Sequence, residues 1–156
     1  MIWGQHTLRQ RWQSSVHTFR ISGRPDRRTV MTIAYWCVLV AVVLPYVFTV
    51  LAKYGGPGGY SNHHPRDSLD ALKGWRKRAH GAQLNAFEAF APFAAAVIIA
   101  QSTGADQSWV DRLAIAFIVF RVLHGVFYVV DKPAMRSLIW TLGFLCVLGI
   151  FALAAL

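Results

Sequence analysis

The chain has 156 residues, of which 55% are hydrophobic and 15% are charged, and its mean hydropathy is positive. This composition is too apolar for an ordinary soluble domain of the same length, so the soluble classes are excluded. The formal net charge of +9 does not point to a nucleic acid partner, because the basic loops of membrane proteins report topology and contact anionic lipid headgroups.

The first segment, residues 1–30, is a basic extension without an apolar helical pattern. It holds six arginines and two histidines, and Met31 follows it at the start of a long apolar run. That run is too long for a signal peptide and lacks a small-residue cleavage site. We interpret residues 1–30 as a flexible extension, or as sequence ahead of a true start at Met31.

Four later segments are long and apolar enough to be transmembrane helices. Residues 29–52 and 137–156 carry no charged side chain, and two further segments carry one each, Glu88 and Arg121. About 20 apolar residues cross the hydrocarbon core of a bilayer. We predict spans over about 30–52, 77–101, 111–130 and 137–156. Short loops between them predict an all-α, antiparallel four-helix bundle over residues 31–156.

The distribution of Lys and Arg between the loops predicts the orientation. The N-terminal segment and the second loop lie on one membrane face, and the first and third loops lie on the other. With residues 1–30 included, these faces carry seven and eight Lys and Arg residues, which does not decide the orientation. From Met31 onward they carry one and eight. The positive-inside rule then places loops 53–76 and 131–136 in the cytoplasm, as expected for a protein of the bacterial inner (plasma) membrane. Cys37 and Cys146 fall inside spans, and their spacing predicts neither a disulfide nor a metal site.

Polar side chains form one stripe on each of the two middle spans. Each stripe fits within an arc of about 60–80° on an α-helix. Because a charge is costly in lipid, such stripes face the bundle interior or a watery cavity. The stripes are Arg78, Asn85 and Glu88 on the second span and Arg121, His124 and Tyr128 on the third.

Glu88 and Arg121 lie at the same depth in these stripes. Each is ten residues from the face that carries the first loop, or roughly 15 Å at 1.5 Å per residue. This predicts a buried ion pair between the two side chains. Asn85, one turn nearer that face, is expected either to link helices by hydrogen bonds or to serve a site.

Several polar residues converge closer to the first-loop face and predict an anion pocket. They are Arg66, Arg78, His124, Tyr128 and Arg136. The planar fork of donors on arginine suits carboxylates. Taken singly, each arginine is better explained by lipid headgroups, Tyr128 by an aromatic belt and His124 by an interhelical hydrogen bond. Only their convergence from different helices favours a pocket.

The segments RAHGAQLNAFEAFAPF and FRVLHGVFYVVDKPAMRS, with NHHPRD in the first loop, resemble the MAPEG family, the membrane-associated proteins of eicosanoid and glutathione metabolism. The two longer motifs are fairly specific together and weak singly, and the resemblance covers most of the chain from Met31 onward. It implies a homotrimer of four-helix protomers. It also implies that glutathione binds between neighbouring protomers, near one membrane face.

The resemblance also implies roles for single residues. Family members carry a helix-two asparagine and glutamate, an Arg-x-x-His-x-x-x-Tyr motif in the prostaglandin-synthase type, and an Arg-Ser pair whose arginine is implicated in stabilising the glutathione thiolate. The matching positions are Asn85 and Glu88; Arg121, His124 and Tyr128; and Arg136 and Ser137. One departure is that several members have an arginine four residues before the asparagine, where this chain has Gly81.

The leading interpretation is a glutathione-transferase-like enzyme, with transferase or peroxidase activity on lipophilic electrophiles that enter from the bilayer and glutathione as co-substrate. The expected catalytic residues are Arg136, Tyr128 and Ser137, because a nearby cation favours the nucleophilic thiolate. The expected glutathione-binding residues are Arg66, Arg78, Asn85, Glu88, Arg121 and His124. The alternative is a non-catalytic trimeric scaffold, or an accessory subunit of a larger membrane complex, which Gly81 and the basic extension favour.

Overall fold

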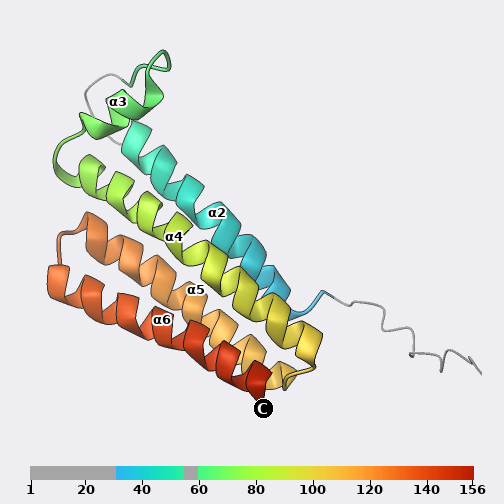
Figure 1. The fold of residues 1–156 in the computed structure, drawn as a ribbon. Coiled ribbons are helices and arrows are strands. Elements are labelled where there is room, and N and C mark those ends of the chain that lie inside the picture. The colour runs from blue at the N-terminus through green and yellow to red at the C-terminus, as the bar shows by residue number, and fades with distance from the viewer. Residues whose placement is uncertain (1–30, 55–59) are drawn as a thin grey trace, which may run out of the picture. The chain divides into compact units, whose positions relative to one another are not determined.

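The computed structural model describes residues 31–54 and 60–156, so the predicted extension 1–30 lies outside the described residues. The described chain is helical throughout its regular parts (Figure 1). In chain order the helices are α2 (Ile33–Tyr54), α3 (Pro65–Asp70), α4 (Gly74–Thr103), α5 (Gln107–Val129) and α6 (Pro133–Ala155). All but α3 are long and apolar enough to cross a membrane. The predictions of an all-α bundle and an integral membrane protein are therefore confirmed.

The helices α4 and α5 are the central pair of the bundle, because each packs against all three of the other long helices. Figure 1 shows the four long helices side by side. Their main core is rich in small side chains, including Ala34, Ala41, Ala96, Ala100 and Ala114, all buried. Small residues let helix backbones approach closely where lipid offers no hydrophobic drive for association. Between α4 and α5, the rings of Phe93 and Phe117 stack with centroids 3.9 Å apart.

Tight turns connect the last three helices. Gly104 ends α4 with φ of +80°, and Asp131 follows α5 with φ of +61°. The amide of Lys132 donates to the carbonyl oxygen of Phe127 at 3.0 Å, which is the wrapping bond of a Schellman motif. Pro133 then occupies the start of α6, where a proline costs no hydrogen bond. These turns make α4, α5 and α6 antiparallel neighbours.

A polar cluster fastens the helix ends farthest from α3. Asp111 of α5 accepts hydrogen bonds from the backbone amide of Ala34 and from the side chain of Gln107, both at 2.8 Å. Gln101 of α4 donates to Gln107 at 2.6 Å. The carboxylate thus caps the first turn of α2 from a different helix, where the positive end of the helix dipole favours an anion.

Candidate functional site

Side chains from α4, α5 and α6 surround a polar hollow of about 310 Å³. This volume falls at the lower end of the range found for small-molecule sites, about 300–1,000 Å³. The polar hollow is lined by Asn85, His124, Tyr128, Arg136, Ser137, Trp140 and Thr141. All three predicted catalytic residues and two of the predicted glutathione-binding residues therefore line one concavity.

Arg136 and Tyr128 form the charged part of the polar hollow. The guanidinium carbon of Arg136 lies 4.4 Å from the centroid of the Tyr128 ring, close enough for a cation–π contact. Arg136 belongs to the first turn of α6, where its amide donates to the carbonyl oxygen of Lys132 at 2.9 Å. The half-buried side chain is held against the ring with its nitrogens free of any carboxylate among the described residues.

Gly81 determines where the Tyr128 ring lies. A β-carbon built at Gly81 would come within 2.7 Å of the Tyr128 hydroxyl oxygen and within 2.8 Å of two ring carbons. The phenol therefore rests directly on the backbone of α4. Besides Arg136, it contacts the buried ring of His124 in a T-shaped arrangement, with centroids 5.7 Å apart. Several members of the family that the sequence resembles have an arginine at the position of Gly81. An arginine there would compete with Tyr128 for this space.

A second concavity, the apolar cavity, adjoins the polar hollow. It encloses about 180 Å³ and is lined by Asn85, Glu88, Ala89, Pro92, Phe117, Arg121, Trp140, Phe144 and Val147. The two concavities share Asn85 and Trp140 as wall residues. A ligand in one of them therefore lies next to a ligand in the other.

The predicted ion pair between Glu88 and Arg121 is wrong, because Asn85 takes the place of the carboxylate. Arg121 Nη1 donates to Asn85 Oδ1 at 3.0 Å, and Asn85 Nδ2 donates to Glu88 Oε2 at 3.4 Å. Arg121 Nη2 donates to the carbonyl oxygen of Trp140 at 3.4 Å, a contact allowed because Gly143 has no side chain in the way. Arg121 thus pairs with the residue one turn nearer the first-loop face than Glu88, which the predicted equal depth of Glu88 and Arg121 did not foresee.

Arg78 and Arg66 do not line either concavity. Arg78 Nε donates to the carbonyl oxygen of Val129 at 3.0 Å, and Arg78 Nη1 lies 3.5 Å from Asp131 Oδ2. These contacts satisfy the carboxyl end of α5, where a cation complements the helix dipole. Arg66 lies on α3 with an exposed side chain. Within one protomer, the predicted anion pocket thus keeps Arg136, His124 and Tyr128 and loses these two arginines.

Arg76 and Lys77, the neighbours of Arg78, are bound to other elements. Buried Arg76 donates from Nε to the carbonyl oxygen of Ala52 at 2.8 Å and from Nη2 to that of Lys53 at 2.7 Å. The three consecutive cations at the start of α4 therefore reach three places: the end of α2, the end of α3 and the end of α5.

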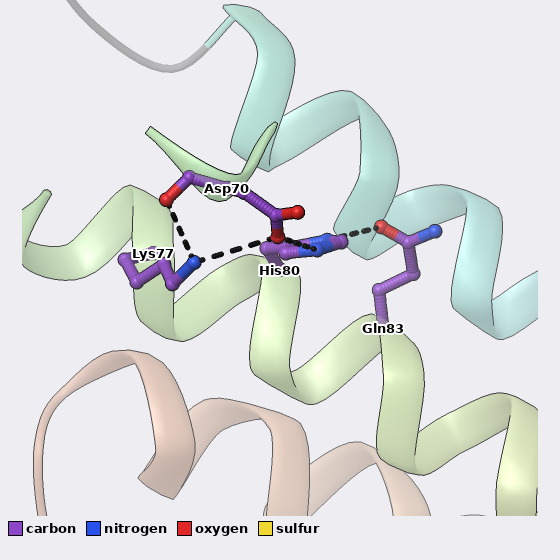
Figure 2. Close-up of polar contacts among 4 residues, drawn as sticks. All are labelled: Asp70, Lys77, His80 and Gln83. Atoms are coloured by element: carbon purple, nitrogen blue, oxygen red, sulfur yellow. Dashed lines mark hydrogen bonds and ion pairs between the residues drawn. The ribbon is translucent and has the colours of Figure 1, made fainter. Parts of the chain in front are cut away.

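Figure 2 shows how α3 is attached to α4. Lys77 Nζ donates to the carbonyl oxygen of Asp70 at 2.8 Å and lies 3.6 Å from its carboxylate. His80 Nε2 lies 3.7 Å from the same carboxylate, and His80 Nδ1 is 3.1 Å from Gln83 Oε1. This group lies apart from both concavities, and we assign it the role of fastening α3.

Two wall residues of the polar hollow, Trp140 and Thr141, were not anticipated. They lie one helical turn after Arg136 and Ser137, and Thr141 Oγ1 donates to the carbonyl oxygen of Ser137 at 3.0 Å. The spacing of four residues on a predicted helix was the signal that would have found them. Within the described ranges, no group of three or more His, Cys, Asp and Glu is placed to hold a metal ion.

The fold and the polar hollow define a class of membrane protein with four spanning helices and a cation-bearing site between the last three. The chain belongs to the MAPEG family, whose sequence model matches residues 33–156. No curated protein and no solved structure matches the chain.

Proposed function

We propose that this protein is a membrane-embedded glutathione-dependent transferase or peroxidase that acts on lipophilic electrophiles. Membership of the MAPEG family supports a glutathione-related activity. The observation that carries the proposal is the polar hollow, in which Arg136, Tyr128 and Ser137 meet beside an apolar cavity. A peptide thiol and an apolar compound would lie next to each other in such a pair of concavities.

The donors of the polar hollow fit glutathione, which carries two carboxylates and a thiol. A guanidinium, a phenol, a hydroxyl, an imidazole and an amide line the space, and these groups bind anions through charge-assisted hydrogen bonds. Arg136 also lies in the first turn of α6, where the helix dipole adds to its positive potential. His124 and Asn85 would hold the peptide.

Arg136 would act on the thiol itself. A free thiol has a pKa of about 8.5 and is mostly protonated at neutral pH, whereas the thiolate is the nucleophile. The guanidinium of Arg136 would stabilise the thiolate, and the hydroxyl groups of Tyr128 and Ser137 would each donate a hydrogen bond to it. The contact of Arg136 with the Tyr128 ring holds the cation in place before substrate arrives.

Glu88 and Arg121 line the apolar cavity but not the polar hollow. Asn85 connects them by hydrogen bonds, so both set the orientation of an amide that lines both concavities. Glu88 is exposed and is available to a substrate ammonium group. We assign Arg66 and Arg78 no contact with glutathione inside one protomer.

The assembly we propose is a homotrimer with loops 53–76 and 131–136 on the cytoplasmic side of a bacterial inner membrane. The resemblance to the MAPEG pattern supports the trimer, and the distribution of Lys and Arg after residue 30 supports the orientation. Many large apolar side chains of α2 and α6, such as Trp36, Val43, Leu145 and Leu148, are exposed on the single protomer. Lipid or neighbouring copies must cover them.

Calorimetry of glutathione binding to the detergent-purified protein tests the proposal. The matched control for Arg136→Ala is Arg112→Ala. Arg112 also lies over an aromatic ring, with its guanidinium carbon 5.0 Å from the centroid of the Trp109 ring. It lies at the start of α5 and does not line the polar hollow. We expect glutathione to bind the parent and the Arg112 variant with similar affinity. We expect its affinity for the Arg136 variant to be lower. Absence of binding to the parent at millimolar glutathione would instead support the non-catalytic scaffold.

A further inference from the structure

We propose that Arg78 and Asp131 are positioning residues, which hold the turn between α5 and α6 so that Arg136 stays on the ring of Tyr128. Neither of the two lines the polar hollow, so each acts through the turn. For the reaction this inference rests on the proposed function. The claim about the position of Arg136 rests on the contacts of the turn alone and is tested without glutathione.

The turn between α5 and α6 brings Tyr128 and Arg136 together. Tyr128 lies in the last turn of α5 and Arg136 in the first turn of α6. The guanidinium carbon of Arg136 lies 4.4 Å from the centroid of the Tyr128 ring. Because the two side chains come from opposite sides of the turn, a change in the direction of α6 relative to α5 would move the cation off the ring.

Arg78 fastens this turn to α4. Its Nε donates to the carbonyl oxygen of Val129 at 3.0 Å, and its Nη1 lies 3.5 Å from Asp131 Oδ2. The hydrogen bonds within the turn use the two carbonyl groups before that of Val129. Gly81, one helical turn after Arg78, lies under the ring of Tyr128. One face of α4 therefore supports both the ring and the turn.

Asp131 occupies a backbone conformation that suits glycine better. Its φ is +61°, and of the residues that the structure describes it is the one with a positive φ that is not a glycine. Glycine is the usual residue at this position of a Schellman motif, since it has no β-carbon to clash. What aspartate adds there is a carboxylate beside Arg78. An exposed ion pair contributes little to overall stability, so we assign the contact a local effect on the turn.

The start of α6 passes the position of the turn on to Arg136. Lys132 follows Asp131 directly, and its carbonyl oxygen accepts a hydrogen bond from the amide of Arg136 at 2.9 Å. Pro133, the first residue of α6, has φ fixed near −65° by its ring. Little rotational freedom is left between Asp131 and the first turn of α6, so a shift of the turn moves the backbone of Arg136.

Three variants separate this role from a general effect of charge. Asp131→Gly removes the carboxylate while glycine fits the positive φ, and Arg78→Gln removes its partner. Lys77→Gln is the matched control, because Lys77 also lies at the start of α4 and pairs with an aspartate, Asp70, at 3.6 Å. That pair fastens α3 and does not contact the turn.

The Nε–H proton signals of the arginines, recorded by NMR on nitrogen-15-labelled protein in detergent, report where Arg136 lies. A proton held over the face of an aromatic ring is shifted upfield by the ring current. Arg136→Lys assigns the signal by removing it. No glutathione is present in this measurement.

We expect an upfield-shifted Arg136 signal in the parent and in Lys77→Gln, and loss of the shift in Asp131→Gly and Arg78→Gln. Asp131→Asn keeps an oxygen that accepts a hydrogen bond from Arg78, so it should retain part of the shift. The melting temperature of Asp131→Gly should not fall below that of the parent, because glycine relieves the backbone. Loss of the shift in that variant then reports position and not unfolding.

With glutathione and an electrophile, Asp131→Gly should lower kcat more than it changes KM for glutathione. The other groups of the polar hollow stay in place, whereas the cation that holds the sulfur charge is displaced. A misplacement of about 1 Å caused by a residue away from the chemistry costs up to roughly 10²-fold in rate. The thiolate absorbance at neutral pH should fall in the same variant and not in Lys77→Gln.

An Arg136 signal that is equally shifted in the parent, Asp131→Gly and Arg78→Gln would overturn the proposal, as would a parent signal without an upfield shift. Equal loss of the shift in Lys77→Gln would also overturn it, because charge at the start of α4 would then be the cause. If the shift behaves as expected and glutathione does not bind, the positioning role stands and the proposed function fails. If glutathione binds through Arg136 and the shift ignores both variants, the positioning role alone fails.

Discussion

At the scale of single residues, Asn85 connects the buried charges of the site. Arg121 is only 5% exposed, and no carboxylate lies within ion-pair distance of it in the described chain. Its Nη1 depends on the amide oxygen of Asn85, while its Nε has no hydrogen-bond partner there. An uncompensated buried donor on a charged group is costly, so Asn85 carries a larger share of stability than its neutral side chain suggests.

Asn85→Ala should therefore destabilise the protein more than Glu88→Gln. Loss of the amide leaves a buried guanidinium donor without its acceptor, and we expect a free energy of unfolding lower by roughly 1–3 kcal/mol. Glu88 is exposed, so Glu88→Gln should change it by no more than about 0.5 kcal/mol. Unfolding in mixed micelles measures both. If Glu88→Gln is the more damaging change, the carboxylate acts on Arg121 after all.

Gly81→Ala should displace Tyr128 from the backbone of α4. The added methyl group would meet three atoms of a rigid phenol at 2.7–2.8 Å, whereas at Gly149 it would meet a methyl group of Leu113 at 3.1 Å. Overpacking of the first kind costs roughly 1–3 kcal/mol, so Gly149→Ala is the matched control and should be better tolerated. Adding Tyr128→Ala should relieve the Gly81 defect; simple additivity in this double-mutant cycle would count against the contact.

At the scale of helices, the cations that begin α4 fasten the ends of its neighbours. Arg76 satisfies two carbonyl groups at the end of α2, and Arg78 one at the end of α5. The last carbonyl groups of a helix have no partner within the helix. Side chains from the start of α4 therefore stabilise this end of the bundle.

Arg76→Ala should lower the thermal stability clearly, and Lys77→Ala should not. Arg76 is buried and makes charged hydrogen bonds to backbone carbonyls, each worth about 1.5–3 kcal/mol. Lys77 is exposed and its ion pair with Asp70 is worth at most about 1 kcal/mol. Melting of both variants in one detergent compares them. An equal loss of thermal stability in the two variants would mean that positive charge at the start of α4 matters and that the carbonyl contacts of Arg76 do not.

The sequence was sufficient to predict the four spans, because an apolar run of some twenty residues with at most one charge is typical of a transmembrane helix. It placed the start of α4 three residues late, since the cations at its start looked like a loop and are helical. It did not predict α3, whose six residues show no apolar period. Arg78 was predicted in the anion pocket but binds the carbonyl oxygen of Val129 at the end of α5. The unpaired carbonyl groups at a helix end belong to the backbone, so the pattern of side chains in the sequence does not reveal them.

At the scale of the whole molecule, the membrane decides how the site is reached. Four spanning helices place the apolar cavity within reach of lipid, while Arg136 lies at the start of α6 near one end of the bundle. In the reaction we propose, a charged peptide would therefore come from water and an apolar electrophile from the bilayer. The family match begins at residue 33, so the parts that make up this arrangement all lie in the matched region.

The ultraviolet absorbance of the glutathione thiolate, followed over pH on the purified protein, tests the central claim most directly. A cation beside the sulfur stabilises its charged form, so the pKa of the bound thiol is lowered and the thiolate persists as the pH falls below about 8.5, the ordinary value for a free thiol. We predict this signal in the parent and in Arg112→Ala, a weaker one in Arg136→Lys, since a point charge does not reproduce the guanidinium fork, and its loss at neutral pH in Arg136→Ala. A thiolate signal in Arg136→Ala equal to that of the parent would contradict the role of Arg136.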